Sequence, residues 1–185
     1  MVRLVIGSVA GAVAMFIVGL IFWATPLRYA GLSSAGEAPN AAVQLSLAQN
    51  LPHTGRYVVP DVGTPNGTIL YGKGPIATVD YNSRGYSSSD PASMIGGFIQ
   101  DVVVAFMIAF SLYVIAGRVD DFTTRLRVAI GLSAAASVLI LLRDPIWTHT
   151  DWRFAIYALV ADLAALAAAS FVIVRWFLPR VGPAL

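Results

Sequence analysis

The chain has 185 residues, of which 57% are hydrophobic and only 12% are charged. This composition lies outside the usual range of a soluble domain and predicts a protein embedded in lipid. The net charge is only +2 and the basic residues are scattered along the chain, which argues against nucleic acid as a partner. The chain has no cysteine, so the sequence excludes disulfides, thiolate metal sites and cysteine nucleophiles.

Four apolar stretches predict an all-α membrane protein with four transmembrane helices. Residues 1–27 contain an uncharged run long enough to cross a hydrocarbon core of about 30 Å at about 1.5 Å per residue. We expect this run to be retained as an anchor, because it exceeds the apolar core of a usual signal peptide. The other three predicted spans are residues 93–117, 123–143 and 154–175.

The insert at residues 28–92 predicts a small α+β cap between the first two spans. It is too long for a plain loop and too short for a large core of its own. Ala38-Pro39-Asn40 predicts the start of a short helix that ends near Asn50. Arg56–Pro60 and Ile76–Tyr81 predict two strands of a β-hairpin, and Thr68–Tyr71 a third strand.

The basic residues of the short loops predict the orientation of the chain. One side would hold Arg3, Arg118, Arg125, Arg127, Arg175 and Arg180, and the other side would hold Arg28, Arg143 and Arg153. We expect both termini in the cytoplasm of a bacterium, four spans in the inner (cytoplasmic) membrane and the cap in the periplasm. Arg125 and Arg127 lie in the first turns of the third span, where long basic side chains snorkel towards the headgroups.

Charged residues at similar depth in three spans predict a buried polar layer. Asp162 lies near the middle of the last span, where an ionisable side chain is costly and is a functional candidate by default. Asp101 and Arg143 lie at a similar depth, roughly 20 to 24 Å from the cytoplasmic ends of their spans at helical rise. If the last three spans pack as neighbours, Arg143 is placed to pair with Asp101, and Asp162 is a further candidate partner. Further hydrogen bonds would come from Gln100, Ser133, Ser137 and Tyr157.

Two interpretations of this layer stay open. In the functional interpretation, the layer is a proton or ion relay, or a site for a polar headgroup or a quinone. In the structural interpretation, it is an ion pair that only fixes helix register. Small residues share the face of Asp162 and would let another backbone come close. They are Ala155, Ala158, Ala165 and Ala169.

A second small-residue pattern, Gly7-x-x-x-Gly11, lies in the first span. It predicts either packing within the chain or an interface with a partner helix. His53 and His149 are the only histidines and their spacing forms no metal motif, so we predict no metal site. No motif predicts a cofactor, although the polar layer is compatible with a bound lipid or quinone.

Several segments in a fixed order resemble a loose group of uncharacterised bacterial four-span inner-membrane proteins with an insert between spans one and two. These are Trp23-Ala-Thr-Pro-Leu27, a helix beginning near Pro39, Gly55–Pro60 and a three-span tail. The resemblance implies this fold and no activity. The chain has Ala24 or Thr25 at the position where the group carries a histidine, which argues against a metal or haem site there.

No catalytic constellation is present, so the sequence favours a protein that acts by interaction rather than as an enzyme. The leading hypothesis is an accessory, assembly or scaffolding component of a membrane complex, or a homo-oligomer. Its partners would be membrane lipids and other membrane-protein subunits or copies of itself. The alternative is a small proton-coupled transporter, or a lipid- or quinone-binding protein, that uses Asp101, Arg143 and Asp162.

Overall fold

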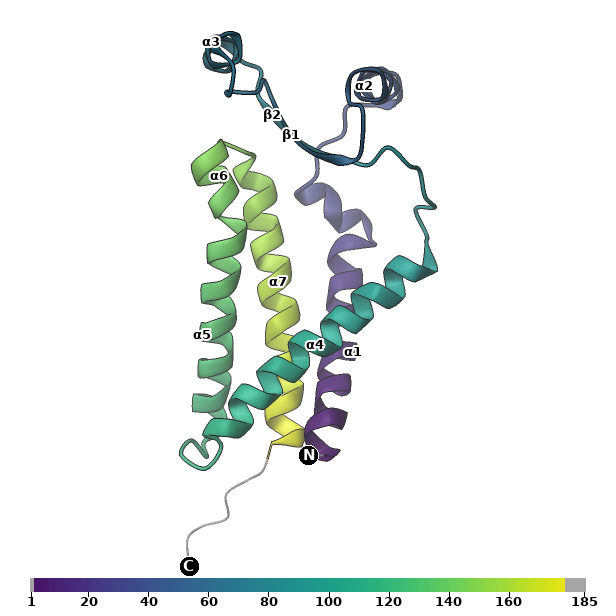
Figure 1. Ribbon diagram of the computed structural model, residues 1–185. Helices are drawn as coiled ribbons and strands as arrows, with labels where there is room; N and C mark the ends of the chain where they lie inside the picture. Colours follow the sequence, from purple (N-terminus) through teal and green to yellow (C-terminus); the bar gives the residue numbers. More distant parts are fainter. Residues whose placement is uncertain (1, 179–185) are drawn as a thin grey trace, which may run out of the picture. The chain divides into compact units, whose positions relative to one another are not determined.

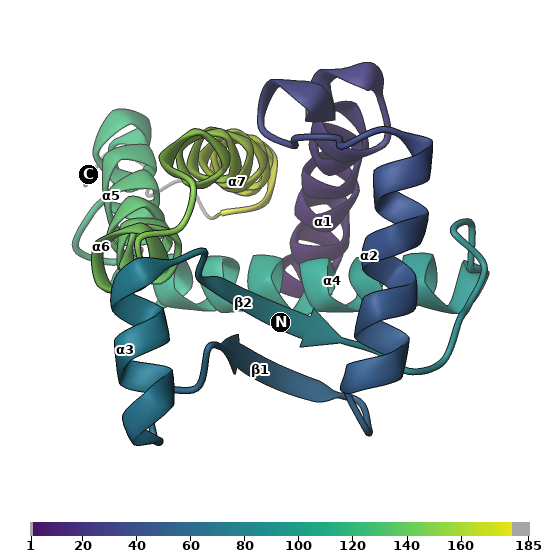
Figure 2. The same cartoon turned by 90° about the horizontal axis from the view of Figure 1, so that it is seen from above.

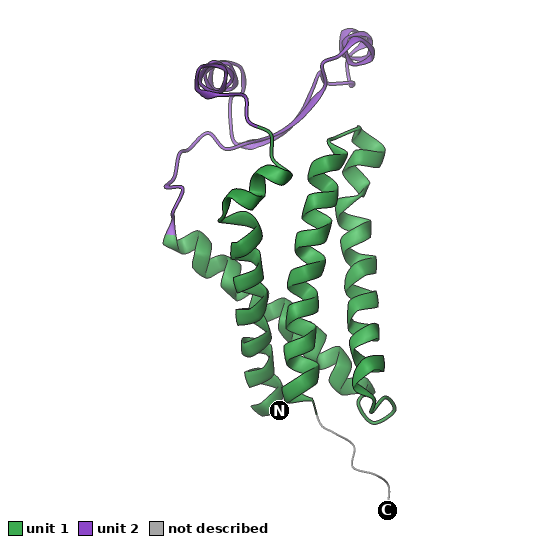
Figure 3. Ribbon diagram, turned by 180° about the vertical axis from the view of Figure 1, so that it is seen from behind, with its two compact units in different colours: residues 1–33, 91–185 green, residues 34–90 purple. Residues whose placement is uncertain are grey.

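The computed structural model of the protein describes residues 2–178. The chain divides into two compact units, which Figure 3 shows in different colours. The described part of the first unit consists of residues 2–33 and 91–178, and the second unit consists of residues 34–90. Arg180, which contributes to the predicted orientation, lies outside the described residues.

The first unit is a bundle of four long helices with three short helical segments. The long helices are α1 (Val2–Trp23), α4 (Pro91–Ile115), α5 (Phe122–Leu141) and α7 (Trp152–Val172). The short segments are η1 (Pro26–Ala30), α6 (Arg143–Thr148) and η2 (Ile173–Phe177). The four long segments are long and apolar enough to cross a membrane, which confirms the prediction of a helical protein with four candidate spans.

Helix α7 lies between α1 and α5, and α4 crosses the bundle obliquely while it packs on α1 (Figures 1 and 2). The buried surface of α7 consists mainly of small side chains. Its most enclosed alanines are Ala155, Ala158, Ala161 and Ala169, each at most 4% exposed. Small residues let helix backbones approach closely, which is the main source of attraction between helices in a lipid environment. Of the alanines predicted on the face of Asp162, Ala155, Ala158 and Ala169 therefore pack α7 against its neighbours.

The glycine pattern of α1 also serves packing within the chain. A Cβ atom placed on Gly7 would lie 2.6 Å from Cβ of Phe177, and one placed on Gly11 would lie 2.9 Å from Cδ1 of Ile173. Phe177 and Ile173 belong to η2, which continues α7. Of the two interpretations of Gly7 and Gly11, intramolecular packing is the one that the structure shows.

Arg125 links α5 to the carboxyl end of α4. Its side chain is 2% exposed; Nε donates to the Val119 carbonyl at 2.6 Å and Nη2 donates to the Ala116 carbonyl at 3.0 Å. The prediction that Arg125 snorkels to the headgroups is therefore wrong. A helix end leaves carbonyls without partners, and a guanidinium carries enough donors to satisfy several of them.

Asp121 caps the amino end of α5. Its Oδ2 accepts hydrogen bonds from the Thr124 amide at 2.7 Å and from the Thr124 hydroxyl at 2.8 Å. These two bonds hold the pKa of Asp121 below its ordinary value, because they stabilise the ionised carboxylate. The cap and Arg125 together define the connection between α4 and α5.

The second unit contains α2 (Glu37–Asn50), β1 (Gly55–Val59), α3 (Pro65–Lys73) and β2 (Ala77–Tyr81). The strands pair antiparallel, with Gly55 opposite Tyr81. The prediction of a third strand at 68–71 is wrong, because these residues lie within α3. Thr64 caps this helix by accepting from the Gly67 amide at 3.0 Å, and Pro65 occupies its first turn. These start signals outweigh a run of only four residues with β propensity.

Replacement of Gly7 by Leu tests the contact between α1 and η2. We expect the variant to lose about 1–3 kcal/mol of unfolding free energy, because the new side chain must displace Phe177. Denaturation in detergent micelles measures the change. Gly19→Leu is the matched control, since a Cβ at Gly19 meets nothing within 4 Å. Equal stability of the two variants would contradict the packing role of Gly7.

Replacement of Arg125 by Gln tests the cap on α4. We expect a loss of about 1.5–3 kcal/mol, because hydrogen bonds from a charged donor to buried carbonyls disappear. The same denaturation assay applies, with Arg127→Gln as the control because Arg127 is exposed on the same helix. A stability unchanged by Arg125→Gln would contradict a stabilising role for its bonds to the Ala116 and Val119 carbonyls, which follow α4.

Candidate functional site

The four long helices of the first unit line an open cavity of about 790 Å³. Because α4 packs on α1 and has little contact with α5, these helices leave space between them. The lining is largely apolar, and its polar members are Gln100, Asp101, Ser111, Ser133, Ser137 and Asp162. A pocket of this size, with few polar groups, is typical of sites for small molecules.

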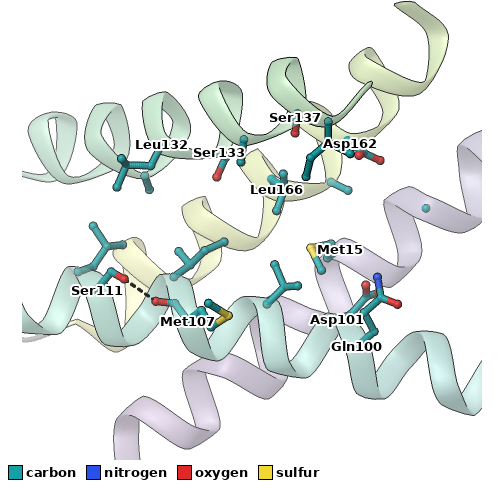
Figure 4. A pocket seen from close by; sticks show the side chains of 18 of the residues that line it. Met15, Gln100, Asp101, Met107, Ser111, Leu132, Ser133, Ser137, Asp162 and Leu166 are labelled. Atoms are coloured by element: carbon teal, nitrogen blue, oxygen red, sulfur yellow. Dashed lines mark hydrogen bonds between the residues drawn. The ribbon is translucent and has the colours of Figure 1, made fainter. Parts of the chain in front are cut away.

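The polar side chains come from facing walls of the cavity. Figure 4 draws Gln100 and Asp101 of α4 on one wall, and Ser133, Ser137 and Asp162 on the opposite wall. The two serines share one face of α5 because they are four residues apart. The structure therefore brings Asp101 and Asp162 into one cavity, as their similar depth suggests.

Both carboxylates lack a partner in the part of the chain that the structure describes. Among residues 2–178, neither Asp101 nor Asp162 has a hydrogen bond or an ion pair, and no basic side chain of these residues lines the cavity. Ser137 is 5% exposed and its hydroxyl likewise has no hydrogen-bond partner in the described chain. In contrast, the Ser111 hydroxyl donates to the Met107 carbonyl at 2.8 Å. Polar groups left unpaired at membrane depth are destabilising unless water or a ligand satisfies them.

Arg143 lies away from this cavity, so the prediction that it pairs with Asp101 and Asp162 is wrong. Its Nε is 3.5 Å from Oδ1 of Asp144, and its side chain is 65% exposed. Helix α5 ends at Leu141 and Arg143 begins the separate helix α6. The depth estimate counted residues from Arg127, but α5 begins at Phe122, so Arg143 lies more than one helical turn further along the span than that estimate gave.

Tyr157 also lies outside the cavity lining and supports the fold. Its hydroxyl donates to the Phe22 carbonyl at 2.6 Å, and its ring meets that of Trp23 edge-on at 5.3 Å between centroids. Arg153 adds two hydrogen bonds from its guanidinium, to the carbonyls of Tyr29 and Ala30, each at 2.6 Å. These contacts tie the end of α1 and segment η1 to the start of α7. The expected role of Tyr157 in the polar layer is thus wrong.

The two alanine candidates on α7 face different surroundings. Ala165 lines the cavity with Asp162. Ala169 is fully buried, and its carbonyl oxygen lies 3.4 Å from the position of a Cβ on Gly11. Only Ala165 therefore belongs to the site, whereas Ala169 packs α7 on α1.

Sequence reasoning missed several members of the lining, including Met15, Trp23 and Ser111. Trp23 has the position of an aromatic-belt residue at the end of a span, so its sequence context points to the membrane interface rather than to a cavity. Met15 and Ser111 carry no local signal at all. They line the cavity only because α4 crosses the bundle obliquely (Figure 1).

Comparisons with known proteins give no match to this chain. No protein-family model matches it, and no curated protein or solved structure matches it significantly. The resemblance to uncharacterised bacterial four-span inner-membrane proteins stays a prediction, as do the functions of the residues in the cavity.

Replacement of Tyr157 by Phe separates a structural role from a role in the cavity. We expect the variant to lose about 1 kcal/mol of unfolding free energy, because one hydrogen bond to a backbone carbonyl is removed while the ring stays. Denaturation in micelles measures this loss. Tyr113→Phe is the control, since Tyr113 is 46% exposed on α4. An unchanged stability of Tyr157→Phe would contradict the assignment.

Proposed function

We propose that the protein binds an amphipathic molecule from the bilayer in the cavity between α4, α5 and α7. The apolar part of the molecule would contact side chains such as Val104, Leu132 and Leu166. Its polar end would meet Asp101 and Asp162. The observation that carries the proposal is a cavity of about 790 Å³ that holds two unpaired carboxylates.

The apolar lining supports an apolar ligand. Burying apolar surface contributes about 25 cal/mol per Å², and a few polar groups then fix the orientation of the molecule. The lining combines branched aliphatic side chains with two methionines, Met15 and Met107. Methionine side chains are unbranched and polarisable, so they adapt to ligands of irregular shape.

A role as an accessory or scaffolding subunit is the competing hypothesis. It rests on faces of the bundle that could meet another helix, and the Gly7 and Gly11 face was its main candidate. Phe177 and Ile173 of the same chain cover that face. The remaining exposed apolar side chains, such as Leu139 and Val114, need no protein partner where they meet lipid. The cavity therefore supports ligand binding better than scaffolding.

We also propose the bacterial inner membrane as the location, with the second unit in the periplasm. Arg118 and Arg127 flank the connection between α4 and α5, and Arg175 follows α7. Arg143 and Arg153 flank the connection between α5 and α7. An excess of basic residues at one end supports a cytoplasmic location for that end.

The ligand-binding proposal is tested by filling the cavity. Ala136 lines it and Ala135, its neighbour on α5, does not. We expect wild-type protein purified from native membranes in a mild detergent to retain about one amphipathic molecule per chain, detected by native mass spectrometry. Ala136→Trp should lose this molecule because the indole occupies its space, and Ala135→Trp should retain it.

The controls distinguish the two functional hypotheses. Melting curves establish that both tryptophan variants are folded. Equal amounts of bound lipid in the wild type and in both variants would contradict a site in the cavity. Recovery of a stoichiometric protein partner without any bound small molecule would favour the scaffolding hypothesis instead.

A further inference from the structure

We infer that the molecule bound in the cavity is a lipophilic cation, with Asp101 and Asp162 as the residues that select its charge. This inference rests on the proposed function and specifies its ligand class. The charge of the cavity is the first observation. Its lining contains two carboxylates, and no Arg, Lys or His of residues 2–178 contributes to it.

Both carboxylates are available to a molecule in the same cavity. Asp101 is on α4 and Asp162 on α7, and the two walls face each other across the cavity (Figure 4). A positive charge between them would interact with two opposite charges in a medium of low dielectric constant. Such charge-assisted contacts are about twice as strong as neutral hydrogen bonds.

A second, independent observation points to a ligand at the same place. Ser137 is 5% exposed, and its hydroxyl has no partner among residues 2–178 although it lines the cavity with Asp162. A hydroxyl that opens on an apolar cavity is normally paired, and a bound molecule or water can pair this one. Ser133, one turn away on α5, adds another acceptor to the same wall.

The aromatic part of the lining agrees with a cation. Trp23 of α1 lines the cavity and is 36% exposed. The face of an indole attracts cations, and quaternary ammonium groups are recognised by such rings. Two ionised carboxylates in this lining would be stabilised by a cation and not by a neutral molecule, so we favour the cation over a neutral quinone or lipid.

Two probes of the same shape and opposite charge test the inference. Tetraphenylphosphonium is a cation and tetraphenylborate an anion, and each has four phenyl rings around one atom. The full-length protein is placed in nanodiscs of zwitterionic phosphatidylcholine, and equilibrium dialysis measures binding. Empty nanodiscs give the partitioning of each probe into lipid, which is subtracted. We expect saturable binding of the cation, at least roughly tenfold tighter than that of the anion.

Neutral replacements identify the residues responsible. Asp101→Asn and Asp162→Asn should each weaken cation binding by roughly tenfold, because each removes one charge-assisted contact. Asp120→Asn is the matched control, since Asp120 is exposed outside the helices and does not line the cavity. It should bind the cation like the wild type. Equal cation binding by all three variants would overturn the role of the carboxylates.

The outcomes separate this inference from the proposed function. If the wild type binds both probes equally and Ala136→Trp binds neither, the cavity is a ligand site without charge selection, and only the inference fails. If the wild type binds neither probe and also retains no molecule from native membranes, both proposals fail. The comparison of two probes on the wild type remains decisive even where an aspartate variant does not fold.

Discussion

The close packing of α7 against α1 through small side chains is the constraint on which the bundle depends. In lipid, apolar side chains gain little by meeting one another, so helices associate where their backbones come close. Ala169 and Gly11 provide such a place, and η2 extends it to Gly7 through Phe177. Arg153 and Tyr157 fix the other end of α7 to the segment that follows α1. Helix α7 is thus held to α1 along its length.

The cavity is a consequence of how α4 is held. One part of α4 packs on α1, where the rings of Phe98 and Phe16 meet edge-on at 5.6 Å between centroids. Its carboxyl end is fixed by the hydrogen bonds of Arg125. Because α5 packs on α7 and has few contacts with α4, space remains between these helices. The same contacts that stabilise the bundle therefore keep the cavity open.

The sequence predicted the features that depend on local composition and depth. Four uncharged runs predicted the helices, and helical rise placed Asp101 and Asp162 at one level. Contacts that depend on how the chain turns between helices were not predictable from composition and depth. Arg143 pairs with its neighbour Asp144, and the return of the chain after α4 buries Arg125 against carbonyls that no sequence pattern reveals. The crossing angle of α4, which creates the cavity, likewise depends on tertiary packing alone.

The position of Arg143 decides how the carboxylates are best interpreted. An arginine between Asp101 and Asp162 would have made them part of an ion-pair layer that fixes helix register. With Arg143 paired to Asp144, the bundle gains no stability from either carboxylate, and each is costly at membrane depth. Residues that destabilise a fold and form no stabilising contact in it are concentrated at functional sites. Asp101 and Asp162 fit that description because their only common surrounding is a cavity large enough for a ligand.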